Sequence, residues 1–389
     1  MKRVYLDYAA TTPTDPDVLK AMEPYFFEQF GNPSSIHSFG QEAKKAMEDA
    51  RQRLALFLGA KPEEIVFTSG GTESNNFALL GVAYALKEKG DHIVTTQIEH
   101  HAISEPLKFL KKSGFKVTPV KVDKYGLVDP EEIKKAITKK TILISVMHAN
   151  NEIGTIQPIA QIGRIARGAG VYFHSDAVQT VGHIPVDVGE LNVDLLSLSA
   201  HKFYGSKGVG ALYIRKGTRV ESFLRGGDQE NGRRASTQNT AGIVGMGEAV
   251  VLCQERMEEE AASQTRLRDK LIKEIQDKIS EVYLNGHPTE RLPNNVNFSI
   301  KYIEGESMLL NLDMLGIAAS TGSACTSSSL EPSHVLLAIG LPHEIAHGSL
   351  RITLGRWTKE EEVDYLLEHL PPVVEKLRAM SPLYDNRKI

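Results

Sequence analysis

The chain has 389 residues, a length typical of about two or three domains, with enough apolar sequence for a sizeable buried core. Its composition is ordinary for a globular protein, and a net charge of −4 argues against a dedicated nucleic-acid binder. Its two cysteines, Cys253 and Cys325, exclude a disulfide scaffold and a cysteine-based zinc site. Because we find neither a signal-peptide pattern nor an apolar run of about 18 residues, we expect a cytoplasmic protein without a membrane span.

The first two-thirds of the chain alternate short β-rich runs with helical patterns. Several of the runs are almost continuously apolar, as in strands that are covered on both faces. We expect strands over residues 64–68, 92–96, 116–120, 141–146, 171–174, 194–199 and 210–214. We expect helices between them over residues 41–58, 73–89, 102–112, 130–138 and 158–167. This alternation predicts an α/β fold with a mostly parallel seven-stranded central sheet.

From about residue 241 the pattern changes to that of a smaller α+β region. It predicts one long helix or two in series, then a strand, a helix and a final helix, over residues 243–279, 295–300, 306–314 and 359–380. We therefore expect a large domain over residues 12–255. A small α+β domain over residues 256–389 would be completed by residues 1–11. Within residues 320–344, a Ser-, Thr- and Gly-rich stretch is typical of a mobile surface loop.

Lys202 follows the expected strand 194–199, in the string Ser199-Ala200-His201-Lys202. The carboxyl ends of such strands are where open α/β sheets bind ligands. This lysine is either a side chain that reaches solvent or a Schiff-base lysine for a carbonyl cofactor such as pyridoxal phosphate. The second interpretation requires an acidic partner for a ring nitrogen, and Asp176 follows a neighbouring expected strand. Taken alone, Asp176 is more simply a turn or capping residue.

Three further fragments lie at the ends of expected strands. Gly70-Gly71-Thr72 opens a helix, which suits a phosphate, although it forms neither a Walker loop nor a dinucleotide fingerprint. An imidazole of His100 or His101 could stack on a flat cofactor ring. The amides of Asn150 and Asn151 could hydrogen-bond a ring substituent, or these residues could simply form a turn. The adjacent His100 and His101 do not form a metal-binding pattern, and we identify no other. Together these fragments predict a single active site at the carboxyl edge of the sheet.

The motifs in combination resemble those of the cysteine desulfurases, in particular the NifS/IscS-type group of the class V, fold-type I pyridoxal-phosphate enzymes. The similarity runs over essentially the whole chain and is carried by residues 5–12, 31–35, 69–74, 150–154, 175–179, 199–202 and 349–356. It implies a homodimer with the fold-type I architecture. It also implies conversion of L-cysteine to L-alanine, with the sulfur passed to an iron–sulfur scaffold or to a tRNA-thiolation protein.

The resemblance also implies a role for individual residues. The catalytic residues would be Lys202, which would hold pyridoxal 5'-phosphate covalently, His100, and Cys325, which would carry the sulfur as a persulfide. The cofactor would be bound by Gly71, Thr72, His100, Asn151, Asp176, Gln179, Ser199, His201, Lys202 and, from a second subunit, Thr237. The substrate would be bound by Asn32, Asn151 and Arg351, and the fork of an arginine suits a carboxylate.

Cys325 distinguishes this activity from its alternatives. Its small polar neighbours favour an accessible nucleophile, whereas Cys253, in an apolar helical run, is expected to be a buried small hydrophobe. The main alternative is a selenocysteine lyase or another class V aminotransferase or lyase. A non-catalytic relative and a Rossmann-type dehydrogenase are two others. One segment departs from the family, because Arg234-Ala235-Ser236-Thr237-Gln238-Asn239 stands where Arg-Ser-Gly-Thr-Glu-Asn is usual.

Overall fold

The structure is a computed structural model that describes residues 3–321, 332–382 and 384. Its largest element is a seven-stranded sheet with the strand order β2-β8-β7-β6-β5-β3-β4. The strands are β2 (Ile65–Thr68), β3 (His92–Thr96), β4 (Lys116–Val120), β5 (Thr141–Ser145), β6 (Tyr172–Asp176), β7 (Leu195–Ser199) and β8 (Gly210–Ile214). Only β8 runs antiparallel to its neighbours, so the predicted mostly parallel sheet is confirmed.

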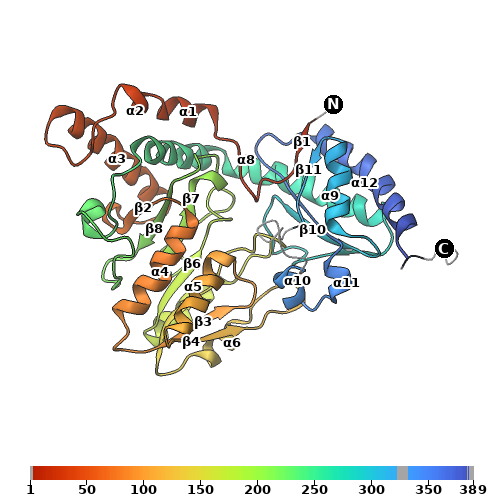
Figure 1. Cartoon of the computed structure of the whole chain (residues 1–389), viewed down its shortest axis with the longest axis horizontal. Helices are drawn as coiled ribbons and strands as arrows, with labels where there is room; N and C mark the ends of the chain where they lie inside the picture. Colours follow the sequence, from red (N-terminus) through yellow and green to blue (C-terminus); the bar gives the residue numbers. More distant parts are fainter. Residues whose placement is uncertain (1–2, 322–331, 383, 385–389) are drawn as a thin grey trace.

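Helices cover both faces of this sheet (Figure 1). One face packs against α4 (Gly71–Ala85) and α5 (His101–Lys112). The other packs against α3 (Ser38–Phe57), α6 (Pro130–Ala136), α7 (Ile159–Ala169) and the first half of α8 (Thr240–Lys278). Successive side chains of a strand point to opposite faces, so Val66 enters the first core and Phe67 the second. Burial on both sides explains the nearly continuous apolar runs in the sequence.

A three-stranded antiparallel sheet forms a second unit, with the order β12-β10-β9. Its strands are β9 (Val282–Leu284), β10 (Asn295–Ile300) and β12 (Ser349–Thr353). They share an apolar core with the second half of α8, α9 (Gly305–Met314) and α12 (Glu360–Met380). Near the N-terminus, β1 (Val4–Tyr5) pairs in parallel with β11 (Ile317–Ala318), so the start of the chain lies beside these C-terminal elements (Figure 1).

The helix α8 belongs to both units. Its Ile243 and Met246 lie in the core of the large sheet, whereas Leu267 and Leu271 lie in the core of the small one. The predicted domain boundary after residue 255 falls inside this continuous helix, and the division at that residue stays a prediction. None of the helices in the described ranges combines the length and the hydrophobicity that crossing a membrane requires.

The remaining helices are short. They are α1 (Pro16–Met22), α2 (Pro24–Phe27), α10 (His334–Ala338) and α11 (His343–Ala346), with 3-10 turns at Pro62–Glu64, Ala200–Lys202 and Gln229–Gly232. α10 and the first half of α11 fall within residues 320–344. Most of the Ser-, Thr- and Gly-rich stretch of this range, which the sequence predicts to be a surface loop, lies outside the described residues. α10 follows that stretch, and its Val335 and Leu336 are buried.

Candidate active site

The carboxyl ends of neighbouring strands of the large sheet meet at one cavity of about 430 Å³. Parallel strands end at the same edge of a sheet, so the polar residues that follow them are brought together there. Ten of the residues singled out in the sequence line this cavity: Gly71, Thr72, His100, Asn151, Asp176, Gln179, Ser199, His201, Lys202 and Arg351.

Lys202 lies in the 3-10 turn that directly follows β7. Its Nζ donates hydrogen bonds to the carbonyl oxygen of Ala10, at 2.8 Å, and to that of Ala9. Both carbonyls belong to the N-terminal segment and both residues line the cavity. The half-buried Lys202 therefore lies in the cavity wall, and its role as a Schiff-base lysine stays a prediction.

Asp176 is the last residue of β6, whereas the sequence placed it just after the strand. Its side chain is held from two directions. Oδ2 accepts a hydrogen bond from Asn75 Nδ2 at 2.7 Å, and Oδ1 accepts one from the backbone N–H of Val178 at 3.0 Å. The carboxylate is 6% exposed and borders the cavity, an arrangement suited to pairing with a protonated ring nitrogen.

His100 is the N-cap of α5, and this role determines its tautomer. Its Nδ1 accepts a hydrogen bond from the N–H of Ala102 at 3.0 Å, so the neutral ring carries its proton on Nε2. Burial is the main cause of a lowered His100 pKa; the charge of Lys202 lowers it further, while Asp176 opposes the shift. At neutral pH, His100 is therefore a neutral N–H donor in the wall of the cavity.

The start of α4 forms a cradle suited to an anion. Gly70 has φ +153°, and a Cβ on Gly71 would lie only 2.7 Å from Cγ2 of Val178, so a glycine is required for this close approach. The first N–H groups of a helix lack intrahelical partners and attract negative charge. A second hollow, of about 470 Å³, shares Gly71, Thr72, Ser199 and His201 with the main cavity.

His201 completes this end of the site as a neutral donor or acceptor. Its Nδ1 lies 3.1 Å from the hydroxyl of Thr11. Burial, followed by the charge of Lys202, lowers the pKa of His201 to about 4. Gln179 contributes from the segment after β6, where its Nε2 donates to the carbonyl of Ala9 at 3.0 Å.

Arg351 is the contribution of the small sheet to the cavity. It lies on β12 and is 3% exposed. Its Nη2 donates to Asp7 Oδ1 at 2.8 Å, and its Nη1 donates to the backbone carbonyl of Asn151 at 3.0 Å. Its buried Nε has no hydrogen-bond partner among the residues that the structure describes. One guanidinium thus joins the N-terminal segment, the segment after β5 and the small sheet beside the cavity.

Of the predicted site residues in the described ranges, two are not brought into this cavity. Asn32 is exposed, and its Oδ1 accepts a hydrogen bond from the N–H of Ser34 within a local turn. Thr237 is exposed on the surface of this chain, and its contact with a second subunit's cofactor stays a prediction. Cys325 lies outside the described residues. Cys253 is 1% exposed with a thiol pKa raised by burial to about 12, so the expectation of a buried small hydrophobe is confirmed.

The whole chain matches proteins of known family. Residues 4–366 match the family Aminotransferase class-V. The chain is 60% identical over 390 positions to "Cysteine desulfurase IscS" of Dictyoglomus turgidum, covering 100% of this chain and 99% of that protein.

Two solved structures are also similar. A "NIFS-LIKE PROTEIN" matches with a TM-score of 0.91 and 41% identity, over 97% of this chain and 100% of that one. The protein of "SspA in complex with cysteine" matches with a TM-score of 0.81 and 37% identity, over 92% and 100%.

The chain belongs to the class V aminotransferases, in their cysteine desulfurase group. The resemblance identified from the motifs is therefore confirmed, as is the fold-type I architecture. The family's usual glycine is replaced by Ser236, which adopts φ +89°. The departure therefore places a side chain in a conformation that favours glycine.

Sequence reasoning missed two residues that orient the site. Asn75 holds Asp176, and Asp7 holds Arg351. Asn75 gave no signal because its contact depends on how α4 lies against β6. Asp7 belongs to one of the motifs that carry the resemblance, but the sequence analysis gave it no role. Its partner, Arg351, lies 344 residues further along the chain.

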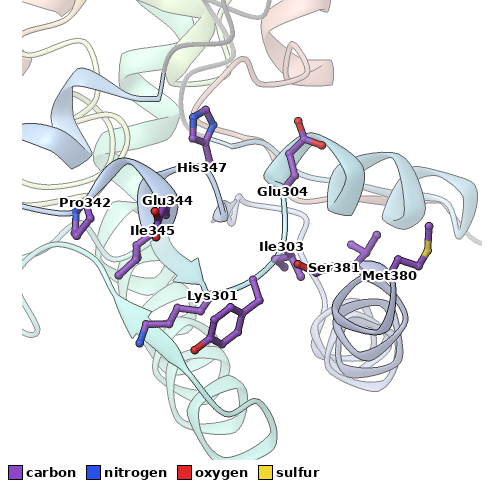
Figure 2. A pocket seen from close by; sticks show the side chains of 11 residues that line it. Lys301, Ile303, Glu304, Pro342, Glu344, Ile345, His347, Met380 and Ser381 are labelled. Atoms are coloured by element: carbon purple, nitrogen blue, oxygen red, sulfur yellow. The ribbon is translucent and has the colours of Figure 1, made fainter. Parts of the chain in front are cut away.

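The other features that were considered do not add to the site. Among residues 3–321, 332–382 and 384, no group of three His, Cys, Asp or Glu side chains could hold a metal ion. A larger hollow of about 770 Å³ lies in the second unit, where Lys301, Glu304, His347 and Met380 are among its lining residues (Figure 2). Of the predicted site residues in the described ranges, none lines this hollow.

Proposed function

We propose that this protein is a cysteine desulfurase that binds pyridoxal phosphate and converts L-cysteine to L-alanine. The observation that carries the proposal is that Lys202, Asp176, His100 and Arg351 line one cavity. An amine, a buried carboxylate, an imidazole and a guanidinium form the set of groups that amino-acid chemistry on this cofactor requires. The named relatives support cysteine as the amino acid.

The residues that are present fit pyridoxal phosphate. The N-terminus of α4, with Thr72, Ser199 and His201 beside it, suits the phosphate, and the carboxylate of Asp176 suits the ring nitrogen. Lys202 supplies the amine that would bind the aldehyde carbon. A volume of about 430 Å³ is that of a typical small-molecule site. When bound, the cofactor acts as an electron sink that allows bonds at the substrate's Cα and Cβ to break.

The protein's own residues would supply binding, proton transfer and sulfur capture. Arg351 would bind the substrate carboxylate, and the amine of Lys202 would take the proton from Cα. His100, with its proton on Nε2, would donate a hydrogen bond to the reacting substrate. The thiolate of Cys325 would attack the substrate sulfur. The new S–S bond would form as the C–S bond breaks, and the carbon would take up a proton to give alanine.

We also propose a cytoplasmic homodimer that delivers its sulfur to an iron–sulfur scaffold or to a tRNA-thiolation protein. Large apolar side chains near α2 and before α3 support a dimer, because Phe26, Phe27 and Phe30 are 61–64% exposed and Ile36 is 94% exposed. A second copy could cover this surface. A reducing compartment suits an enzyme that must keep a reactive thiol free.

The visible absorption spectrum of the purified protein, followed by addition of L-cysteine, tests the proposal. We expect an absorption band that changes when L-cysteine is added, together with alanine and a persulfide on Cys325. Cys325→Ala should form no persulfide and no alanine, while Cys253→Ala serves as the matched control and should keep both. A protein that stays colourless with added pyridoxal phosphate would contradict the role of Lys202. A coloured protein that converts selenocysteine but not cysteine would support the alternative activity.

A further inference from the structure

The first turn of α10 is joined to the cavity wall through Ser333. The hydroxyl oxygen of Ser333 caps the helix by accepting hydrogen bonds from the N–H groups of Val335, at 3.1 Å, and Leu336, at 3.4 Å. The same hydroxyl donates its hydrogen to Oε2 of Glu152. Ser333 and Glu152 are each 5% exposed. A single buried hydroxyl therefore links the helix to the residue directly after Asn151, which lines the cavity.

His334 makes a second link of the same kind. Its Nε2 donates a hydrogen bond to the backbone carbonyl of Glu99 at 2.9 Å. Its ring lies against that of His101, with 5.2 Å between the two centroids. Glu99 and His101 flank His100 in the chain. Two consecutive residues at the start of α10 thus contact the segments that carry Asn151 and His100.

Apolar packing holds α10 in the same place. Val335 and Leu336 belong to a buried cluster with Ile98, Met147 and Ile153. These three partners come from the segments after β3 and after β5, and Met147 lines the cavity. The helix is therefore attached to the wall formed by the large sheet, although it follows β11 of the second unit in the chain.

The chain between β11 and α10 contains Cys325, and it is attached at both ends beside the cavity. At the first end, Ser320 and Arg351 exchange backbone hydrogen bonds of 3.1 and 2.6 Å. At the other end, Ser333 and His334 make the hydrogen bonds to Glu152 and Glu99 described above. Cys325 precedes Ser333 by eight residues, so an extended chain allows the two residues to be at most about 28 Å apart. The attachment at Ser333 thus limits the region that the Cys325 thiol can reach.

We propose that Ser333 and His334 are positioning residues for sulfur transfer, and this inference rests on the proposed function. They attach the end of the Cys325 segment to the walls that carry His100 and Asn151. The transfer that they assist is the attack of the Cys325 thiolate on the substrate sulfur. In that step the S–S bond forms, the C–S bond breaks, and its electron pair stays with the substrate carbon. Loss of an attachment slows this step without weakening cysteine binding, because the thiolate reaches the sulfur less often.

Single-turnover experiments on the holoenzyme test the role of Ser333. Mass spectrometry measures persulfide formation on Cys325, and the cysteine-dependent change in absorbance measures substrate binding. We expect Ser333→Ala to slow persulfide formation by about 10-fold to 100-fold, with an unchanged half-saturating cysteine concentration. Ser333→Thr, which keeps a hydroxyl, should recover most of the rate. Asp129→Ala is the matched control, because Asp129 caps α6 through a similar hydrogen bond to the N–H of Glu131 but does not line the cavity.

A second pair of variants covers the case in which Ser333→Ala does not fold. His334→Gln keeps a donor for the Glu99 carbonyl and should retain the rate, whereas His334→Leu removes the donor and should slow persulfide formation. Wild-type rates in both Ser333→Ala and His334→Leu would overturn the positioning role. So would a slower reaction that is fully explained by weaker cysteine binding. A wild-type protein that forms no persulfide from L-cysteine would overturn the proposed function itself.

Discussion

The two sheets contribute to the cavity in different ways. The large sheet provides several polar residues from the ends of adjacent parallel strands, among them Asp176 and Ser199. The small sheet provides Arg351 from the middle of an antiparallel strand, opposite Asn297. The carboxyl ends of parallel strands lie at one edge of the sheet, so the residues that directly follow each strand are brought close together. An antiparallel strand offers no such grouping. The proposed function thus divides the roles: the large sheet would hold the cofactor, and the small sheet would select the substrate.

The largest effect is expected at the large sheet, where Lys202→Ala removes the amine. We expect alanine formation from L-cysteine to fall by at least about 10⁴-fold, the upper end of what one acid–base group contributes. Initial rates of alanine formation measure this change. Lys216→Ala is the control, because Lys216 is exposed after β8 and does not line the cavity. A loss of less than about tenfold in Lys202→Ala would remove the central chemical role from the large sheet.

At the small sheet, we expect Arg351→Ala to lower kcat/KM for L-cysteine by about 100-fold, mainly through a higher KM. Losing one partner of a buried charge contact costs about 2–5 kcal/mol, and each 1.4 kcal/mol is a factor of ten. Arg351→Lys should recover only part of the loss, because an ammonium lacks the guanidinium fork. Steady-state kinetics separate kcat from KM. If kcat collapses at constant KM, Arg351 acts in the chemistry, and the proposed division between the sheets is wrong.

A smaller effect is expected from Asn75→Ala, which removes the hydrogen bond to Asp176. We expect the Kd for pyridoxal phosphate to rise about tenfold, since a hydrogen bond to a charged group contributes about 1.5–3 kcal/mol. Titration of cofactor-stripped protein measures this change. With saturating cofactor, the KM for L-cysteine should stay unchanged. Asn76→Ala is the adjacent control, because the Asn76 side chain donates a hydrogen bond to the carbonyl of Thr72 within the helix and does not line the cavity. Equal Kd values for the two variants would contradict the role of Asn75.

The smallest effect concerns the pH dependence of stability. Burial raises the pKa of Glu99 from 4.5 to about 8, so the folded protein keeps a proton that the unfolded chain releases. Stability contributed by this group therefore falls as pH rises between these two values. Glu99→Gln removes that dependence and should gain, relative to wild type, about 1 kcal/mol in unfolding free energy from pH 5 to pH 6, since one pH unit inside this interval corresponds to about 1.4 kcal/mol. Urea unfolding at the two pH values measures this gain. If the unfolding free energy changes by the same amount in both proteins, Glu99 is ionised in the folded state and the prediction is wrong.

The fold could be predicted well where elements are long or strongly apolar. The expected strands at 92–96, 116–120 and 210–214 match β3, β4 and β8 at both ends, and the long helix expected over 243–279 is α8. The expectation missed β1, β9, β11 and β12, whose stability comes from pairing with a partner strand. For β1 that partner is β11, near the other end of the chain.

For this protein, the sequence alone determined the α/β architecture, the family and most of the residues that line the cavity. The regular alternation of strands and helices predicted the architecture, whereas the family and most of the site residues came from the resemblance of the motifs. Tertiary structure alone decided which side chains hold those residues in place. The pairs Asn75–Asp176, Asp7–Arg351 and Glu152–Ser333 join residues that are far apart in the sequence. Such hydrogen bonds depend on distances of a few ångströms between separately folded segments, and no local pattern of residues encodes them.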